Sequence, residues 1–537
     1  MPASNPPPGR ASDWPDGWVL FALLAAGFAA RLALAASTFL NPDESLHYWL
    51  SVQTSLRLAY QASLTTVHPP LLILFLYFWR SIGHSELMLR LPSVAAGMGF
   101  AWIGFKWLER ISNRRIAAFV LILLLFSPSL IALTAEVRQY AFLLLFISAS
   151  LYFFDSAIGE CSSTKMAISG AALLLALLTH YSALLFAVAL GVYSLLRLYP
   201  LRNQTTLVGV WIATQIACLA IGAYLFAPHI AMLRTQGVVQ DIADTWLRAS
   251  IFHRGETSLP FFLGRQTLRL FRYLFGQPAV GPVGLIFFVW GICVLLRSEQ
   301  PNLLAPSPRQ LTVLLIAPLL INIALSGVYP YGGTRHNSFL ALFVMTGVSL
   351  SLGSLRFGSS WALPAVVIAV LGISNVSPSP GGPYIRPRDQ QSRLVHQAMD
   401  FLRQSATPGA IILSDYQGAL VLGYYLCDAR AVLVESSSDP YPRFACSPYN
   451  VVTTDAHHWS FNAKDFRLEM EKMEAEHHVS RESELWLFQT GWGIASDRDW
   501  PRTLATVGCS QPAKFGRDIS VCRIASNRTS SSATDRR

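Results

Sequence analysis

The chain has 537 residues, of which 52% are hydrophobic and only 13% are charged. Soluble domains carry roughly 25% charged residues, so this composition excludes an ordinary soluble enzyme of this size. The net charge of +10 comes from Lys and Arg residues scattered between apolar stretches. Such residues act as orientation signals and headgroup contacts. We therefore predict a polytopic α-helical membrane protein that lies in a lipid bilayer and has no nucleic-acid partner.

Apolar runs long enough to cross a hydrocarbon core of about 30 Å recur from Trp18 to the region of Val376. The stretch before Trp18 is Pro-rich and nearly uncharged, so we expect a disordered tail at 1–16 and an uncleaved first helix. One long apolar run is divided at Thr179–Ser182, because undivided it would exceed one bilayer. The predicted spans are 18–39, 88–108, 116–134, 139–157, 166–181, 184–199, 205–228, 281–297, 311–329, 337–354 and 361–376.

The positive-inside rule gives an orientation to these eleven spans. With a cytoplasmic N-terminus, every predicted inside loop holds a Lys or Arg. We therefore expect a multi-pass membrane protein whose N-terminus is cytoplasmic and whose C-terminal part is extracytoplasmic. Three amphipathic stretches on the outer side predict helices that lie along the membrane surface, at 43–58, at 70–82 and in "LGRQTLRLFRYLFG".

The C-terminal part, about 385–525, alternates a helical pattern ("RLVHQAMDFLRQ") with β-rich runs ("AIILSDY", "AVLVES", "ELWLFQT", "ISVCRIA"). This pattern predicts a small α/β domain after a membrane domain at 17–376. We place the α/β domain at 377–525 and a disordered tail at 526–537. If it is extracytoplasmic, its four cysteines permit two disulfides, whose connectivity the sequence leaves open.

The first candidate site is "NPDESLHYWL", directly after the first span. Asn41 and Pro42 are typical of a helix start, and Glu44 has the spacing of a capping box, so a purely structural interpretation is strong. The same helix N-terminus also keeps a carboxylate such as Asp43 ionised, which a catalytic base requires. The two interpretations are compatible.

Three arginines are predicted at the outer ends of spans: Arg90 in "LMLRLPS", Arg138 in "EVRQY" and Arg335 in "TRHNSF". One arginine at such a depth is explained by snorkelling to the interface. Three of them beside carboxylates indicate a site, because uncompensated charge among helices costs roughly 2.5 kcal/mol or more. Guanidinium groups suit the phosphate of a lipid-linked donor.

Other polar residues at the same depth are further candidates for substrate contact, although each could also be an interfacial anchor. They are His68, Glu136, Tyr140, His180, Tyr181 and His336. A divalent metal held by Asp43, His47 and a third group is conceivable, but the chain lacks any of the usual metal-ligand spacings. It also lacks nucleotide-binding glycine loops, so nucleotide-driven chemistry is unsupported.

Taken in order, the motifs "NPDESLHYW", "HPPLLILFLYFWRSIGHSELMLRLPSVAAG", "SPSLIALTAEVRQYAFLLLF", "THYSALL" and "TRHNSFLALF" resemble the bacterial branch of the dolichyl-phosphate-mannose protein mannosyltransferase family. That family belongs to the GT-C glycosyltransferase superfamily, which includes the aminoarabinose transferases. The resemblance covers about 18–355. It implies a GT-C type membrane fold, a polyprenyl-phosphate-linked sugar donor, an extracytoplasmic active site and inversion at the anomeric carbon.

By this resemblance, Asp43 is the catalytic base and Glu44 its acidic neighbour, while Arg90, Arg138 and Arg335 meet the donor phosphate. The acceptor stays open between a protein, a polysaccharide and a lipid. Two other classes remain as alternatives: a transporter or flippase of lipid-linked saccharides, and a non-catalytic subunit of an envelope assembly. A transporter predicts charges toward both membrane faces and an internal repeat, and we find neither in the sequence. A phosphoethanolamine-type transferase or a ligase is a lesser alternative.

Overall fold

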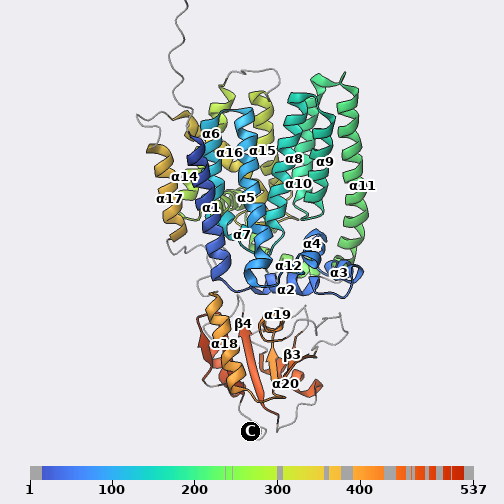
Figure 1. Cartoon of the computed structure of the whole chain (residues 1–537), viewed down its shortest axis with the longest axis vertical. Helices are drawn as coiled ribbons and strands as arrows, with labels where there is room; N and C mark the ends of the chain where they lie inside the picture. The colour runs from blue at the N-terminus through green and yellow to red at the C-terminus, as the bar shows by residue number, and fades with distance from the viewer. Residues whose placement is uncertain are drawn as a thin grey trace, which may run out of the picture. The chain divides into compact units, whose positions relative to one another are not determined.

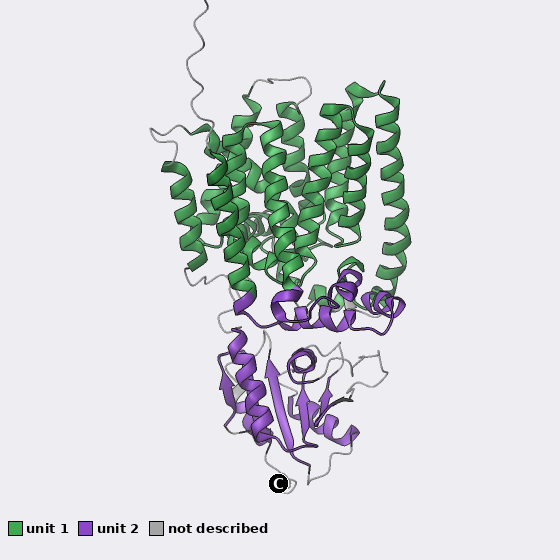
Figure 2. Ribbon diagram, viewed as in Figure 1, with its two compact units in different colours: residues 1–35, 64–72, 90–386 green, residues 36–63, 73–89, 387–537 purple. Residues whose placement is uncertain are grey.

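The computed structural model describes residues 15–235, 238–244, 246–298, 306–355, 362–376, 391–427, 443–454, 461, 466–477, 483–490, 500–509 and 511–524. These residues form two compact units (Figure 2). Unit 1 contains 1–35, 64–72 and 90–386, and unit 2 contains 36–63, 73–89 and 387–537. The segment after the first helix therefore contributes to both units.

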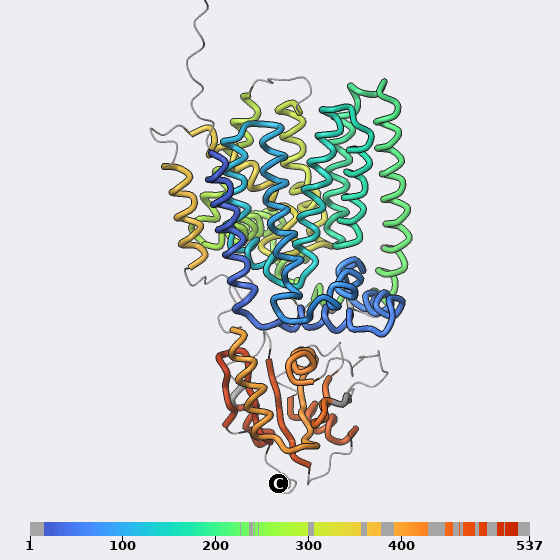
Figure 3. Tube along the Cα trace, in the orientation of Figure 1, coloured from blue at the N-terminus to red at the C-terminus, as the bar shows by residue number. Residues whose placement is uncertain are grey.

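Unit 1 is built from apolar helices, many of which run side by side (Figures 1 and 3). In chain order they are α1 (Gly17–Ser37), α5 (Glu86–Ile111), α6 (Arg114–Phe126), α7 (Pro128–Thr134), α8 (Tyr140–Glu160), α9 (Ser163–Leu177), α10 (Ala183–Leu198), α11 (Thr205–Thr235), α12 (Val238–Asp244), α13 (Leu259–Phe275), α14 (Val280–Leu296), α15 (Pro308–Ala324), α16 (Ala341–Ser354) and α17 (Ala362–Val376). Three 3₁₀ turns join them: η1 (Tyr199–Leu201), η2 (Arg248–Ser250) and η3 (Arg335–Leu340).

Each predicted span coincides with one of these helices or with a pair of them. Among the described residues, six helices are long and apolar enough to cross a membrane, or up to eight if each of two bent pairs is one span. Three further apolar helices, α9, α15 and α17, are shorter. The predicted break at Thr179–Ser182 is confirmed, because α9 ends at Leu177 and α10 begins at Ala183. The protein is a multi-pass α-helical membrane protein, and the count of eleven spans stays a prediction.

The predicted span 116–134 is bent by 61° between α6 and α7. Pro128 ends the regular hydrogen bonding of α6 and begins α7. Arg31 of α1 supplies hydrogen bonds at this bend: its guanidinium donates to the carbonyl oxygens of Leu124 at 3.0 Å and Leu125 at 2.8 Å. It also donates to Oγ1 of Thr134 at 2.8 Å. Backbone groups in a bilayer need such internal partners, so Arg31 has a structural role.

Unit 2 begins with the short helices of the segment that follows α1. They are α2 (Pro42–Ser51), α3 (Leu56–Ser63) and most of α4 (Leu71–Trp79). The predicted amphipathic stretch 43–58 is thus divided into two helices, and 70–82 corresponds to α4. The third predicted amphipathic helix is α13 of unit 1, which makes a 103° bend with α14.

The rest of unit 2 is a six-stranded sheet with the order β2-β3-β1-β4-β6-β5. Its elements are α18 (Ser392–Ser405), β1 (Ile411–Ser414), α19 (Tyr416–Tyr425), β2 (Arg443–Cys446), β3 (Tyr449–Thr453), α20 (Phe466–Glu476), β4 (Leu485–Thr490), α21 (Trp500–Thr506), β5 (Ala513–Phe515) and β6 (Ile519–Ile524). β1 pairs in parallel with both β3 and β4, and the outer pairs are antiparallel.

Side chains alternate between the two faces of this sheet, as the period of a strand requires. Leu413 and Leu487 pack with Met470 of α20 on one face. On the other face, Trp486 lies edge-on to Phe401 of α18, with ring centroids 6.0 Å apart. The predicted α/β character of the C-terminal part is therefore confirmed, while the predicted strand "AVLVES" lies outside the described residues.

The four C-terminal cysteines form two disulfides, Cys427–Cys446 and Cys509–Cys522. The second one ties the segment after α21 to β6. The sequence predicted two bridges and left their connectivity open, because four cysteines allow three pairings.

Candidate active site

Aromatic and imidazole side chains from four chain segments meet at one end of the helices of unit 1. The ring of His180 lies 5.3 Å from that of His68, 5.1 Å from that of Tyr140 and 5.8 Å from that of His336. The rings of Tyr140 and His336 are 6.2 Å apart. We call these four side chains, together with Arg138 and Arg335, the imidazole cluster.

Two guanidinium groups complete this cluster. The guanidinium carbon of Arg138 lies 5.7 Å from the centroid of the Tyr140 ring, which is a cation–π distance. The side chain of Arg138 is 3% exposed, and Arg335 is half-buried. Both positive charges act on His180. The cluster therefore brings two cations into a largely buried group of imidazole and phenol rings.

The chain delivers these residues from helix ends and turns. Arg138 lies between α7 and α8, Tyr140 begins α8, and His180 lies in the tight turn between α9 and α10. Arg335 and His336 begin η3. Because the breaks between these helices occur at the same end of unit 1, residues far apart in sequence converge there (Figure 1).

The glycine pair before Arg335 is required by its surroundings. Gly332 has φ +118°, a conformation that side chains rarely adopt. A Cβ on Gly333 would lie 2.6 Å from the carbonyl oxygen of Arg269. The turn therefore packs directly against α13, and this close approach fixes the start of η3.

His180 is held neutral in this environment. Burial, followed by the positive charges of Arg138 and Arg335, lowers the pKa of His180 from 6.5 to about 3. Its Nδ1 accepts a hydrogen bond from the backbone N–H of Ser182 at 3.1 Å. In the neutral ring the proton is therefore on Nε2, so His180 can donate a hydrogen bond to an acceptor.

Tyr181 points to another partner: its hydroxyl lies 2.5 Å from Nδ1 of His229 of α11. Glu136 is half-buried and interacts electrostatically with Tyr273 of α13. Tyr273 also interacts with Tyr140 and Arg335.

The sequence reasoning missed His229, Tyr273 and Tyr329. The hydroxyl of Tyr329 donates to the carbonyl oxygen of His336 at 3.4 Å. None of them belongs to a recognisable motif. The only signal was the presence of a polar ring at the end of an apolar helix.

The predicted base lies in unit 2, at the start of α2. Asn41 caps this helix: its side chain accepts a hydrogen bond from the N–H of Glu44 at 3.1 Å, and the Glu44 carboxylate accepts one from the N–H of Asn41 at 3.1 Å. This is a complete capping box. Glu44 therefore has a structural role. Asp43 is 6% exposed, and its carbonyl oxygen lies 2.5 Å from Nδ1 of His47.

Arg90 is almost completely buried in α5 and donates a hydrogen bond to the carbonyl oxygen of Ala35 at 2.7 Å. This carbonyl lies in the last turn of α1, where carbonyl groups lack helical partners. Among the described residues, no group of three or more His, Cys, Asp and Glu side chains is arranged to hold a metal ion.

A second polar cluster lies toward the other end of α8. The carboxylate of Asp155 accepts hydrogen bonds from Nε1 of Trp107 and from the hydroxyl of Tyr193, each at 2.8 Å. It also lies 3.5 Å from Nε of Arg197. We call these four residues, all buried, the paired cluster. The sequence reasoning passed over it, although a single Asp within an apolar span is a recognised signal.

Comparisons with known proteins address the family and the fold. Residues 67–231 match the model of the family described as dolichyl-phosphate-mannose-protein mannosyltransferase. The crystal structure of ArnT from Cupriavidus metallidurans bound to undecaprenyl phosphate is similar to this chain with a TM-score of 0.53 and 14% sequence identity, over 97% of this chain and 99% of that one.

A second similar structure is the Archaeoglobus fulgidus oligosaccharyltransferase tethered with an acceptor peptide, with a TM-score of 0.47, 9% identity and coverage of 89% of this chain and 70% of that one. The search among curated proteins found no match. The family match confirms the resemblance over 67–231, and the likeness to ArnT confirms the fold. The chain has a GT-C glycosyltransferase fold, and residues 67–231 carry the sequence pattern of the mannosyltransferase family.

Proposed function

We propose that the protein is a membrane glycosyltransferase that moves a sugar from a polyprenyl-phosphate-linked donor to an extracytoplasmic acceptor. The observation that carries this proposal is the imidazole cluster, in which Arg138 and Arg335 accompany imidazole and phenol rings. Buried guanidinium groups suit a phosphate, because they offer several fixed N–H donors together with positive charge. ArnT, which shares the fold, was solved with undecaprenyl phosphate, which supports this class of donor.

Within this proposal, Arg138 and Arg335 bind the donor phosphate, and Arg90 is a third candidate for that role. His180 is neutral, so it offers its Nε2–H to a phosphate or sugar oxygen without adding charge. The rings of His68, Tyr140 and His336 lie next to His180 in the imidazole cluster and would contact the substrate.

Asp43 is the proposed general base. The acceptor hydroxyl oxygen forms a bond with the anomeric carbon while the bond from that carbon to the phosphate oxygen breaks, and the hydroxyl proton passes to the Asp43 carboxylate. Attack from the face opposite the phosphate inverts the anomeric configuration. A positioned base contributes typically 10²- to 10⁴-fold to the rate. The leaving phosphate monoester needs charge stabilisation, which the arginines supply.

The proposed location is the bacterial inner membrane, with the C-terminal domain outside the cytoplasm. The two disulfides support this placement, because such bonds form and persist in oxidising compartments. Alkylation of cells before and after reduction would test it: Cys427 and Cys446 should be blocked until they are reduced.

The test of the activity is transfer from a panel of radiolabelled polyprenyl-phosphate sugars to envelope lipid and protein from a strain that lacks the gene. Purified wild type, Asp43→Asn and Asp400→Asn are compared. Asp400 is a matched control, because its side chain is 62% exposed in a surface ion pair of unit 2. We expect transfer by wild type and Asp400→Asn, and at least a hundredfold loss with Asp43→Asn, in line with the value of a positioned base, about 10²-fold or more.

Equal transfer by wild type and Asp43→Asn would remove Asp43 as the base. Absence of transfer from every donor, with a folded protein, would favour a transporter or an assembly subunit instead. The acceptor that becomes labelled identifies the substrate class.

A further inference from the structure

A pocket of about 490 Å³ lies within unit 2, where α2 and the start of α5 meet the C-terminal domain. Its lining includes Tyr48, His84, Glu86, His396, Tyr424 and Tyr425. This volume falls in the range of small-molecule sites, about 300 to 1,000 Å³. The pocket is separate from the proposed donor-phosphate residues, which belong to unit 1.

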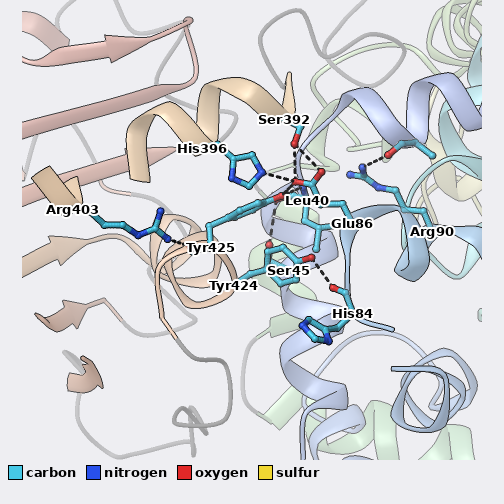
Figure 4. Close-up of polar contacts among 11 residues, drawn as sticks. Leu40, Ser45, His84, Glu86, Arg90, Ser392, His396, Arg403, Tyr424 and Tyr425 are labelled. Carbon is cyan, nitrogen blue, oxygen red and sulfur yellow. Dashed lines mark hydrogen bonds and ion pairs between the residues drawn. The ribbon is translucent and has the colours of Figure 1, made fainter. Parts of the chain in front are cut away.

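Hydrogen bonds hold the walls of the pocket together (Figure 4). The hydroxyl of Tyr425 donates to the carboxylate of Glu86, and Oγ of Ser392 donates to the same carboxylate at 2.8 Å. The hydroxyl of Tyr424 donates to the carbonyl of His84 at 2.7 Å. Because both sides of the pocket are bonded to each other, it is formed before any ligand binds.

The rings that border the pocket meet edge to face. Tyr424 and Tyr425 have ring centroids 4.6 Å apart at 79°, and Tyr48 and Tyr424 have centroids 5.1 Å apart at 90°. His396 is edge-on to Tyr425 at 5.4 Å. Such contacts fix the orientation of each ring and give the pocket rigid apolar surfaces beside polar groups.

The polar groups suit hydroxyl donors. The Glu86 carboxylate has about four lone-pair sites, so beside its bonds to Tyr425 and Ser392 it can still accept from a ligand. Two imidazoles add donors or acceptors. Among the described residues that line the pocket there is no lysine or arginine, so a phosphate or a carboxylate would meet the negative Glu86 without a fixed cation.

The pocket shares a helix with the proposed base. Asp43 and Tyr48 are five residues apart on α2, which is about 7.5 Å along the helix axis. α2 is fastened to α19, because Nε1 of Trp49 donates to the carbonyl of Leu420 at 3.0 Å. The fit is tight, since a Cβ on Gly423 would lie 1.6 Å from Trp49. A group bound in the pocket would therefore be held at a fixed distance from Asp43.

We propose that this pocket binds a neutral saccharide, and that this saccharide is part of the acceptor. The assignment to the acceptor rests on the proposed transferase function, whereas saccharide binding itself does not. Ring faces pack against the C–H groups of a sugar, and Glu86 and the imidazoles hydrogen-bond to its hydroxyls. The C-terminal domain thereby determines acceptor choice, and unit 1 provides the donor-phosphate site.

The test measures binding of methyl glycosides of glucose, galactose and N-acetylglucosamine to the full-length protein in nanodiscs, by saturation-transfer NMR at millimolar ligand. Glucose 6-phosphate is the charged comparison. We expect at least one neutral glycoside to bind, and its Kd to rise at least tenfold in Tyr424→Ala and in Glu86→Gln. The matched controls Tyr199→Ala and Glu471→Gln, both on the surface outside the pocket, should leave Kd unchanged.

Thermal unfolding shows which variants are folded. If Tyr424→Ala or Glu86→Gln fails to fold, His396→Ala replaces it, because the His396 side chain is 58% exposed. Failure of every neutral glycoside to bind, tighter binding of glucose 6-phosphate, or binding that is unaffected by the pocket variants would overturn the proposal.

The same experiment separates the pocket from the proposed function. Glycoside binding is measured without donor, so it reports on the pocket whether or not the protein catalyses transfer. In transfer assays, the pocket variants should raise the KM for the acceptor at least tenfold and leave the KM for the donor unchanged. Glycoside binding without any transfer would support the saccharide site and contradict the proposed transferase function. Transfer with an unchanged acceptor KM in the pocket variants would show that the bound saccharide is not part of the acceptor.

Discussion

The paired cluster and the imidazole cluster both use α8, at positions about 22 Å apart along its axis. In the paired cluster, the carboxylate of Asp155 meets a guanidinium, an indole N–H and a hydroxyl. In the imidazole cluster, two guanidinium groups accompany imidazole and phenol rings. The first group contains its own ion pair, and the second contains the two arginines that we propose bind the donor phosphate.

This difference indicates a structural role for the paired cluster and a functional role for the imidazole cluster. A buried ion pair that is satisfied by further hydrogen bonds fixes how helices pack, and breaking it leaves an uncompensated charge. Charged side chains among membrane helices are costly and are typically retained at functional sites. We therefore expect changes in the paired cluster to affect folding, and changes in the imidazole cluster to affect transfer.

The largest expected effect is that of Asp155→Leu. It leaves the buried Arg197 without its carboxylate, which should cost about 3 to 5 kcal/mol of unfolding free energy. Urea or thermal unfolding of the purified protein measures the loss. The double variant Asp155→Leu/Arg197→Met should recover most of it, because both charges are removed. A double variant as unstable as Asp155→Leu would show that the ion pair is not what Asp155 contributes.

Arg138→Gln should reduce transfer strongly and stability only slightly, which is the opposite of what we expect for Asp155→Leu. We expect a loss of roughly 10²- to 10³-fold in transfer, as for removal of one donor from a preorganised site, with little change in the unfolding midpoint. Arg202→Gln is the control, since Arg202 is an exposed arginine that also lies over a tyrosine ring. A large drop in stability with transfer near the wild-type level would show that Arg138 has a structural role, like the residues of the paired cluster.

The fold was largely predictable because bilayer thickness and apolar run length are linked. Each predicted span corresponds to a helix or a pair of helices, and the break at Thr179–Ser182 was found from the length of the run and its flanking Lys165 and Arg197. The 61° bend at Pro128 was not predicted, because Pro at the start of a short helix after a nearly continuous apolar run is compatible with one span. The grouping of 36–63 and 73–89 with the C-terminal domain was also not predictable, because it depends on long-range contacts such as Trp49 with Leu420.

The candidate site was predictable in part. Charged and imidazole residues at span ends gave Arg138, His180, Arg335 and His336, which the structure brings together. The capping box of Glu44 was predicted from its spacing, and the capping hydrogen bonds confirm it. Asp43 as base, and the arginines as phosphate ligands, stay predictions.

Acid should destabilise the imidazole cluster through His180. Its folded pKa of about 3 is below its unfolded value of 6.5, so the unfolded state binds the proton more readily in that window. The stability that the neutral ring contributes is present above pH 6.5 and is lost as pH falls toward 3. Lowering the pH from 6.5 to 5 should cost about 2 kcal/mol.

Unfolding measured at pH 7.5, 6.5 and 5, compared with His180→Gln, tests this dependence. The variant should lose stability with acid less steeply than wild type over the same interval. Parallel curves for the two proteins would contradict the assignment of the acid sensitivity to His180.

The smallest effect should come from Tyr193→Phe, which removes one of the hydrogen bonds to Asp155 and leaves the others. A hydrogen bond to a charged group contributes about 1.5 kcal/mol or more, so we expect a loss near the low end of that range. In the background Asp155→Leu/Arg197→Met, the same substitution should cost less, because no carboxylate remains to accept the bond. The difference between the two losses measures how strongly Tyr193 is coupled to the ion pair. An identical loss of unfolding free energy in both backgrounds would mean that Tyr193 stabilises the helices by packing. The hydrogen-bonded group would then consist of Asp155, Arg197 and Trp107, without Tyr193.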